Sequence, residues 1–159
     1  MRFRVGQGFD VHALVPGRRL VLAGVELAGT QGLLGHSDAD VLAHAVIDAL
    51  LGGAGLGDIG ALFPDSDERY RGADSMQLLS QALAQVHAQG WRVGNIDCTI
   101  IAQQPRIAPY VAAMRARLAA ELQIAVAEVS IKGKTTEWLG FTGRGEGIAA
   151  MAVVALTGQ

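Results

Sequence analysis

The last apolar segment of the chain places the strongest constraint on its fold. Residues 148–156 read Ile-Ala-Ala-Met-Ala-Val-Val-Ala-Leu, so apolar side chains would stand on both faces of a strand. A strand with one face in water would instead alternate apolar and polar residues. The segment therefore predicts a strand that is covered on both sides, and we interpret this as an indication of oligomerisation.

Strand and helix patterns are interleaved along the rest of the sequence. We expect strands over residues 2–12, 19–27, 91–102, 129–135 and 147–156, and helices over 36–51, 73–89 and 109–122. Ser37 or Asp38 is expected to cap the first helix, and Gly90 to end the second. The order favours a single α+β domain over residues 1–159, with the helices on one face of a four-stranded mixed sheet.

Composition excludes several classes of function. The chain has 159 residues, a net charge of −2 and a sequence pI near 6.0, so it predicts no basic surface for nucleic acid or for membrane lipids. No apolar run reaches the roughly 18 residues of a membrane span, and the first residues lead straight into a predicted strand. Cys98 is the single cysteine, which suits a reducing compartment. We expect a cytoplasmic protein.

Two short patterns bring metal-binding residue types together. Asp10 and His12 are two apart on a predicted strand and share a face, and Asp40, His44 and Asp48 form a stripe along the first helix. Two imidazoles and a carboxylate are a usual ligand set for catalytic zinc, with the fourth position open. A single helical histidine is also often only a hydrogen-bond partner. Asp48 could orient the His44 ring or could cap a loop.

The segment before the first helix allows two interpretations. His36, the Ser37 hydroxyl and free N–H groups at the helix N-terminus could bind an anion. The same residues also make a good capping segment without any ligand.

Several motifs recur in an order that resembles one known family. They are Gly8-Phe-Asp-Val-His12, Leu33-Leu-Gly-His-Ser-Asp-Ala-Asp40, Ala49-Leu-Leu-Gly52, Leu56-Gly-Asp-Ile-Gly60, Phe63-Pro-Asp-Ser-Asp67, Ile100-Ile-Ala-Gln103, Lys132-Gly-Lys-Thr-Thr-Glu137 and Gly140-Phe-Thr-Gly-Arg-Gly-Glu-Gly147. Together they are similar to the 2-C-methyl-D-erythritol 2,4-cyclodiphosphate synthases of the non-mevalonate isoprenoid pathway, over essentially the whole chain.

This resemblance implies a homotrimer with sheets packed around a threefold axis and active sites between adjacent subunits. It implies zinc at Asp10, His12 and His44, and magnesium or manganese at Glu137. The implied reaction is a lyase reaction: the 2-phosphate of 4-CDP-2-C-methyl-D-erythritol 2-phosphate attacks the β-phosphorus, closes a cyclic diphosphate and releases CMP. His36 and Thr135 would stabilise the transition state.

The resemblance also implies the substrate contacts. The sugar-alcohol part would meet Asp58, Ile59 and Gly60, beside a flap formed by Phe63, Pro64, Asp65, Ser66 and Asp67. Cytosine and ribose would meet a neighbouring subunit's Ala102, Gln103, Gln104, Pro105, Arg106, Ile107 and Ala108. The diphosphate would meet Thr135, Thr136 and Glu137, and Ser37 and Lys134 are further candidate substrate contacts. Phe141 and Arg144 would line an axial cavity that can hold an isoprenoid diphosphate.

Two positions depart from the family's usual pattern. Gly133-Lys134 stands where Ala-Thr is common, and Arg106 stands where lysine is commoner. Lys134 could contact phosphate or could point to solvent, and Arg106 keeps the charge with a different geometry.

The residues by themselves allow two other functions. The same three ligands could serve a metal-dependent phosphodiesterase or nucleotide hydrolase, with Asp38 or Asp40 as general base for a water. A non-catalytic trimer could instead bind isoprenoid diphosphates through Arg144 and Phe141. The reaction product distinguishes the first alternative, and the effect of His12→Ala on ligand binding distinguishes the second.

Overall fold

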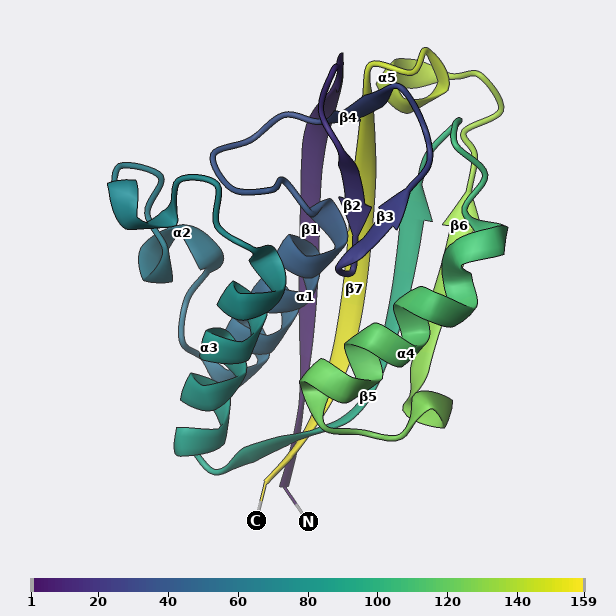
Figure 1. The fold of residues 1–159 in the computed structure, drawn as a ribbon. Coiled ribbons are helices and arrows are strands. Elements are labelled where there is room, and N and C mark those ends of the chain that lie inside the picture. Colours follow the sequence, from purple (N-terminus) through teal and green to yellow (C-terminus); the bar gives the residue numbers. More distant parts are fainter. Residues whose placement is uncertain (1, 159) are drawn as a thin grey trace.

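The computed structural model describes residues 2–158, which form a mixed sheet with helices against it (Figure 1). The strand order in the sheet is β4-β1-β7-β5-β6. Neighbouring strands are antiparallel, except for the parallel pair β5 and β6. The strands are β1 (Arg2–Pro16), β4 (Gln31–Leu33), β5 (Trp91–Ile101), β6 (Val129–Lys134) and β7 (Gly147–Gly158).

The sheet has five strands, so the prediction of four was wrong. The additional strand is the short β4, which pairs with the far end of β1 through Leu14 and Leu33. The predicted strand over 19–27 is also wrong as a single strand. It folds as a hairpin of β2 (Leu20–Leu22) and β3 (Val25–Leu27) in a separate sheet. Ala23 and Gly24 both adopt positive φ, which makes the tight turn between them.

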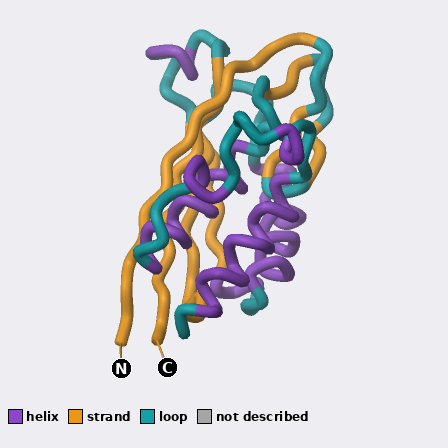
Figure 2. The backbone as a smooth tube through the Cα atoms, turned by 90° about the vertical axis from the view of Figure 1, so that its left-hand side faces the viewer, coloured by secondary structure: helices purple, strands orange, loops and turns teal. Residues whose placement is uncertain are grey.

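The three long helices lie on one face of the sheet, as the rotated view shows (Figure 2). They are α1 (Val41–Ala54), α3 (Ser75–Ala88) and α4 (Val111–Leu122). Short helical turns are α2 (Ile59–Leu62), α5 (Gly140–Gly143), η1 (Glu68–Tyr70), η2 (Ala108–Tyr110) and η3 (Val126–Glu128). The α+β class and the one-sided helix layer are therefore confirmed. Within residues 2–158, every helix is too short or too polar to cross a membrane.

The first helix begins later than the sequence suggested. Asp40 is its N-cap and accepts the Ala43 N–H, so neither Ser37 nor Asp38 caps it. Ala39 adopts a left-handed conformation with φ of 56°, which a helix cannot contain. The helix can therefore start only after this residue.

Two glycines let α1 lie directly on β1. A Cβ atom at Gly6 would come within 1.9 Å of the Ala49 carbonyl oxygen, and one at Gly8 within 1.8 Å of the Ala45 carbonyl oxygen. Only glycine allows so close an approach of strand and helix. Asp10 and His12 are the next residues on this face of β1, so the close packing carries both of them to the start of α1.

The other face of the sheet is exposed and largely apolar where β1 and β7 run side by side. Its apolar side chains are 41–72% exposed: Phe3, Val5, Phe9, Val11, Met151 and Val153. We call these six residues the open sheet face. The two-sided apolar pattern of the last strand thus corresponds to one face under the helices and one face exposed in the single chain.

Candidate active site

Asp10, His12 and His44 converge between the strand β1 and the helix α1. The Oδ2 atom of Asp10 lies 3.0 Å from His12 Nε2 and 3.0 Å from His44 Nδ1. The two ring nitrogens lie 3.1 Å apart. The three atoms therefore form a nearly equilateral triangle, and we call these residues the triad.

The spacing of the triad atoms and the hydrogen position on His12 suit a metal ion. Ligands about 2.1 Å from a tetrahedral ion lie about 3.4 Å from one another, within a few tenths of an ångström of the spacing here. His12 Nδ1 lies 2.9 Å from the Leu34 carbonyl oxygen, which can only accept a hydrogen bond. The hydrogen of neutral His12 is therefore on Nδ1, and the Nε2 lone pair faces the triangle. A lone pair and a carboxylate oxygen aimed at one point suit a cation.

Electrostatics in the metal-free triad also favour positive charge. Burial opposes ionisation of Asp10, but hydrogen bonds and charge from His12 and His44 outweigh it and hold the Asp10 pKa well below its usual range. Burial likewise opposes a charge on His12, but the adjacent Asp10 carboxylate outweighs it and raises the His12 pKa. Without a metal, the site therefore attracts a proton in its place.

Asp40 belongs to the packing of α1, away from the triad. It is completely buried, and its carboxylate accepts the N–H groups of Ala23, Gly24 and Ala43 at 2.9, 2.8 and 3.0 Å. Burial raises the Asp40 pKa to about 6. The residue ties the β2–β3 hairpin to the helix start, and it has no free oxygen for activating a water.

The His44 ring is supported by Ser75, and Asp48 has a different partner. Asp48 accepts the Ile59 N–H at 2.7 Å, so the interpretation as a loop cap is confirmed. The second ring nitrogen of His44, Nε2, instead lies 2.8 Å from Ser75 Oγ and 3.2 Å from Ser37 Oγ. The sequence analysis missed Ser75, because 31 residues separate it from His44 and no local periodicity connects them.

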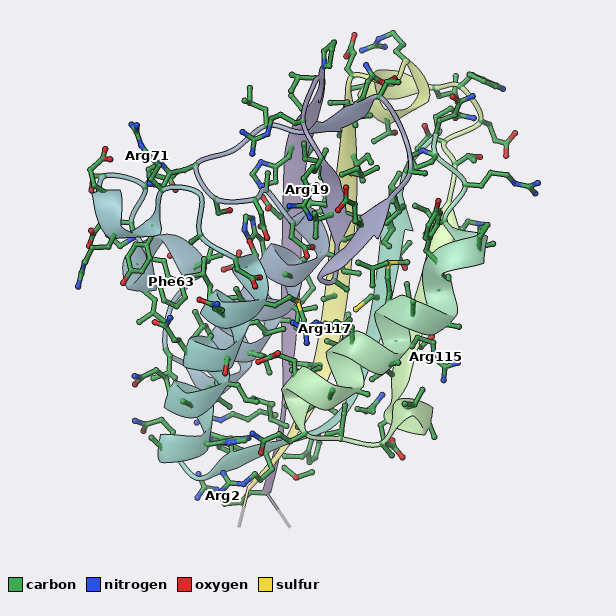
Figure 3. The ribbon with its side chains drawn as sticks, in the orientation of Figure 1. Arg2, Arg19, Phe63, Arg71, Arg115 and Arg117 are labelled. Carbon is green, nitrogen blue, oxygen red and sulfur yellow. The ribbon has the colours of Figure 1, made fainter. Side chains whose placement is uncertain are left out.

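The triad opens into a cavity of about 220 Å³, which we call the triad pocket. Besides the triad it is lined by Gly35, His36, Ser37, Ile59, Gly60, Phe63, Asp65, Tyr70 and Leu78. Phe63 is only 6% exposed and stacks edge to face on Tyr70, and Figure 3 shows it in the lobe that carries α2 and η1. This residue therefore anchors the predicted flap to the core.

Four other residues predicted around the triad do not line this pocket. Asp58 is the N-cap of α2 and accepts the Ala61 N–H at 2.8 Å. Asp67 pairs with Arg69, and its carbonyl oxygen lies 3.4 Å from His36 Nε2. Pro64 and Ser66 are exposed, in the same loop.

A second, larger cavity of about 620 Å³ lies at the C-terminal end of β6, and we call it the β6-end pocket. It is lined by Ala102, Gln103, Pro105, Arg106, Ile107, Ala108, Val111, Ile131, Lys132, Gly133, Lys134 and Thr135. It thus gathers most of the residues predicted to meet cytidine, together with Lys134 and Thr135. Gln104 faces a different hollow, which Leu14 and Thr30 also line.

The remaining predicted residues, which line neither pocket and lie just beyond β6, are Thr136, Glu137, Phe141 and Arg144. Glu137 Oε1 accepts a hydrogen bond from Thr135 Oγ1 at 3.2 Å, and the hydroxyls of Thr136 and Thr142 lie 2.9 Å apart. Phe141 is 41% exposed. The Arg144 guanidinium is paired with Glu146, at 2.9 and 3.1 Å.

The two pockets are separated by the width of the sheet. Asp10 pairs with Ala150, which pairs with Ile100, which pairs with Gly133. Three steps between neighbouring strands, at about 4.8 Å each, place Gly133 about 14 Å from Asp10. Within one chain, the predicted site residues therefore form two separate groups.

The fold and the triad define a class of protein, a small α+β chain with a candidate metal site between a strand and a helix. The model of the YgbB family matches residues 3–157. The chain belongs to the YgbB family, a family of enzymes. It is 62% identical over 154 residues to the 2-C-methyl-D-erythritol 2,4-cyclodiphosphate synthase of Azoarcus sp. strain BH72, which covers 97% of this chain and 95% of the relative.

Solved structures show the same fold. The bifunctional IspDF from Campylobacter jejuni superposes with a TM-score of 0.96 at 45% identity, over 99% of this chain and 43% of that longer one. The chain therefore spans less than half the length of that bifunctional protein. The IspF of Plasmodium falciparum, solved as a CDP complex, superposes with a TM-score of 0.87 at 32% identity, over 99% of this chain and 97% of that one.

Proposed function

We propose that the protein converts 4-CDP-2-C-methyl-D-erythritol 2-phosphate into 2-C-methyl-D-erythritol 2,4-cyclodiphosphate and CMP. It would act as a single domain over residues 1–159, in the cytoplasm, in the synthesis of isoprenoid precursors. The observation that carries the proposal is the triad, a ready cation site at the mouth of a pocket in a chain of this family. The names of the relatives support the same reaction.

The chemistry of the step is a displacement at phosphorus. An oxygen of the 2-phosphate forms a bond to the β-phosphorus and closes the ring. The bond from the β-phosphorus to the bridging oxygen breaks, and that oxygen leaves with its electron pair on CMP. All the reacting groups are anionic, so the protein has to position them and neutralise their charge.

Two cations and the side chains around them would share this task. Asp10, His12 and His44 would hold zinc, and Glu137 would hold magnesium or manganese. Bound cations there would neutralise and polarise phosphate oxygens. His36, in the triad pocket, and Thr135, in the β6-end pocket, would donate hydrogen bonds to the phosphates.

The two pockets suit the two ends of the substrate. Ile59 and Gly60 line the triad pocket and follow Asp58 in the chain, and these three residues would contact the methylerythritol hydroxyls. The larger β6-end pocket would take cytidine, and the CDP complex of a relative supports a nucleotide site in this fold. Lys134 lines the same pocket, which favours its interpretation as a phosphate contact.

We propose a homotrimer, because one chain separates the two pockets by about 14 Å across the sheet. In the trimer, the triad pocket of one subunit would meet the β6-end pocket of the next. The open sheet face supports association, since large apolar patches on a soluble protein mark contact surfaces. Sheets packed through it around a threefold axis would bury Phe9 and Val153.

The test is an assay of the purified protein with 4-CDP-2-C-methyl-D-erythritol 2-phosphate, zinc and magnesium. CMP is measured by chromatography and the cyclic product by phosphorus NMR. We expect one CMP for each cyclodiphosphate, and no reaction after both metals are removed. A hydrolysed nucleotide without cyclic product would favour the metal-dependent hydrolase. The burial of Asp40 counts against that alternative, since it removes one of the two candidate bases.

A further inference from the structure

A second polar cluster lies behind His44, on the side of its ring that faces away from Asp10. His44 is 8% exposed, and Ser75, the first residue of α3, is completely buried. His44 Nε2 lies 2.8 Å from Ser75 Oγ, and this hydroxyl makes a short hydrogen bond to Asp38 Oδ1. The three side chains form a continuous hydrogen-bonded chain from the triad to the loop before α1.

The direction of the hydrogen bonds in this chain follows from the donors available. The Asp38 carboxylate only accepts, and it also takes the backbone N–H groups of Ser75 and Asp40, both at 3.1 Å. Ser75 has a single hydroxyl hydrogen, and the short contact to Asp38 uses it. The Ser75 oxygen can therefore only accept from His44, so His44 Nε2 carries a hydrogen. When a cation takes the place of the hydrogen between Nδ1 and Asp10, the Nδ1 lone pair is left to face that cation.

Ser37 is the other hydroxyl near this ring, and it has a different main partner. Its Oγ accepts the Ala39 N–H at 3.1 Å and lies 3.2 Å from His44 Nε2, farther than Ser75. It also lies 3.4 Å from Ser75 Oγ. Ser37 can therefore assist, but it lacks a carboxylate behind it that would set the direction of its hydrogen.

We infer that Ser75 and Asp38 are positioning residues that hold His44 in the tautomer that presents Nδ1 to a cation. This inference rests on the proposed role of His44 as a metal ligand. The supports of metal-binding histidines fix ring orientation and raise ligand basicity, and their loss costs about 10–100-fold in metal affinity. The start of α3 would thus contribute to the metal site although it holds no ligand itself.

The first measurement needs no variant. Nitrogen NMR of the metal-free protein with ¹⁵N-labelled histidine, at alkaline pH, reports which ring nitrogen of His44 carries the hydrogen. We expect a hydrogen on Nε2, with or without a second one on Nδ1 toward Asp10. A dominant Nδ1–H form would overturn the inference, even if zinc binds.

Variants then test the effect on the metal. In Ser75→Ala we expect a mixture of tautomers and a 10–100-fold loss of zinc affinity, measured by chelator competition. Ser75→Cys keeps the size of the side chain and should change both readouts in the same direction, even if Ser75→Ala does not fold. Asp74→Ala is the matched control, because it removes the N-cap of the same helix outside the chain of hydrogen bonds. Its zinc affinity should equal that of the wild type.

The outcomes separate this inference from the proposed function. Unchanged tautomer and zinc affinity in both Ser75 variants would assign the orientation of the ring to Ser37 or to packing and sink the inference. An equal loss in Asp74→Ala would make Ser75 a merely structural residue. Neither measurement uses the substrate, so a wild-type protein that binds zinc without releasing CMP would refute the proposed reaction alone.

Discussion

The triad pocket and the β6-end pocket are built in different ways. Around the triad, side chains are held by a buried network that includes Ser37 and Ser75, which are at most 9% exposed. Around the β6-end pocket, the polar side chains of Arg106 and Lys134 are exposed and make no hydrogen bond to another described residue. The smaller pocket is therefore organised within one chain, and the larger one is an open surface.

The difference indicates which part of the work each region can do alone. A rigid, hydrogen-bonded pocket suits a metal ion, which needs its ligands within a few tenths of an ångström. An open surface with the flexible side chains of Arg106 and Lys134 needs a second surface before it encloses a ligand. If the trimer is correct, the binding of metal belongs to each chain, and the binding of substrate belongs to the assembly.

The largest effect is expected from His44→Ala. The loss of one triad ligand should remove zinc and lower kcat by about 10³-fold, since the metal contributes several kcal/mol to charge stabilisation. CMP release, bound zinc and sedimentation are the measurements, and the trimer should remain intact. His87→Ala, at a helical histidine of α3 outside the triad pocket, is the control. An unfolded or monomeric His44→Ala protein would instead assign His44 a structural role.

Mixing two inactive variants tests whether the pockets join between chains. His44→Ala lacks a working triad, and Glu137→Ala lacks the proposed second cation site. Random trimers of the two should restore about a quarter of the sites, each with an intact triad from one chain and an intact Glu137 from the next. The CMP release rate of the co-refolded mixture is compared with that of each variant alone. No recovery in verified mixed trimers would place the whole site in one chain.

A smaller effect is expected from Glu137→Gln. The change removes the charge that would attract the second cation, so the magnesium concentration for half-maximal rate should rise about 10–100-fold, with zinc content unchanged. Titration of magnesium in the CMP assay measures this. Glu128→Gln, at the opposite end of β6, is the matched control. An unchanged magnesium requirement would remove Glu137 from the site.

The smallest effect is the pH dependence of the metal-free protein. The contact with Asp10 raises the His12 pKa above 6.5 in the folded state. The contribution of the charged His12 ring to the free energy of unfolding is therefore complete below pH 6.5, and it is lost as pH rises through the pKa of the folded state. Over the same window zinc affinity should rise, because the ligand is the neutral ring.

Thermal unfolding of the metal-free protein should show Tm falling by a few degrees across this window. Chelator competition should show the opposite trend for zinc. His12→Gln should remove the fall in Tm. A Tm that stays constant in the wild type would show that the charge of His12 does not contribute to folding.

The sequence by itself determined what depends on short-range periodicity. The two-residue repeat placed Asp10 and His12 on one face of a strand, and the four-residue stripe placed His44 on the first helix. These repeats follow from the geometry of strand and helix, whatever surrounds them. The helices and the long strands were predictable for the same reason, and the motifs in order indicated the family.

Only the tertiary structure decided what depends on distant segments. The strand β4 is three residues long and has no pattern of its own, so its pairing with Leu14 comes from the path of the chain. The support of His44 comes from Ser75, and that of His12 from the Leu34 carbonyl, which is 22 residues away. The strand order, with β1 and β6 three steps apart, separates the two pockets. Such contacts arise when distant elements pack together to bury apolar surface, and the local residue pattern does not encode them.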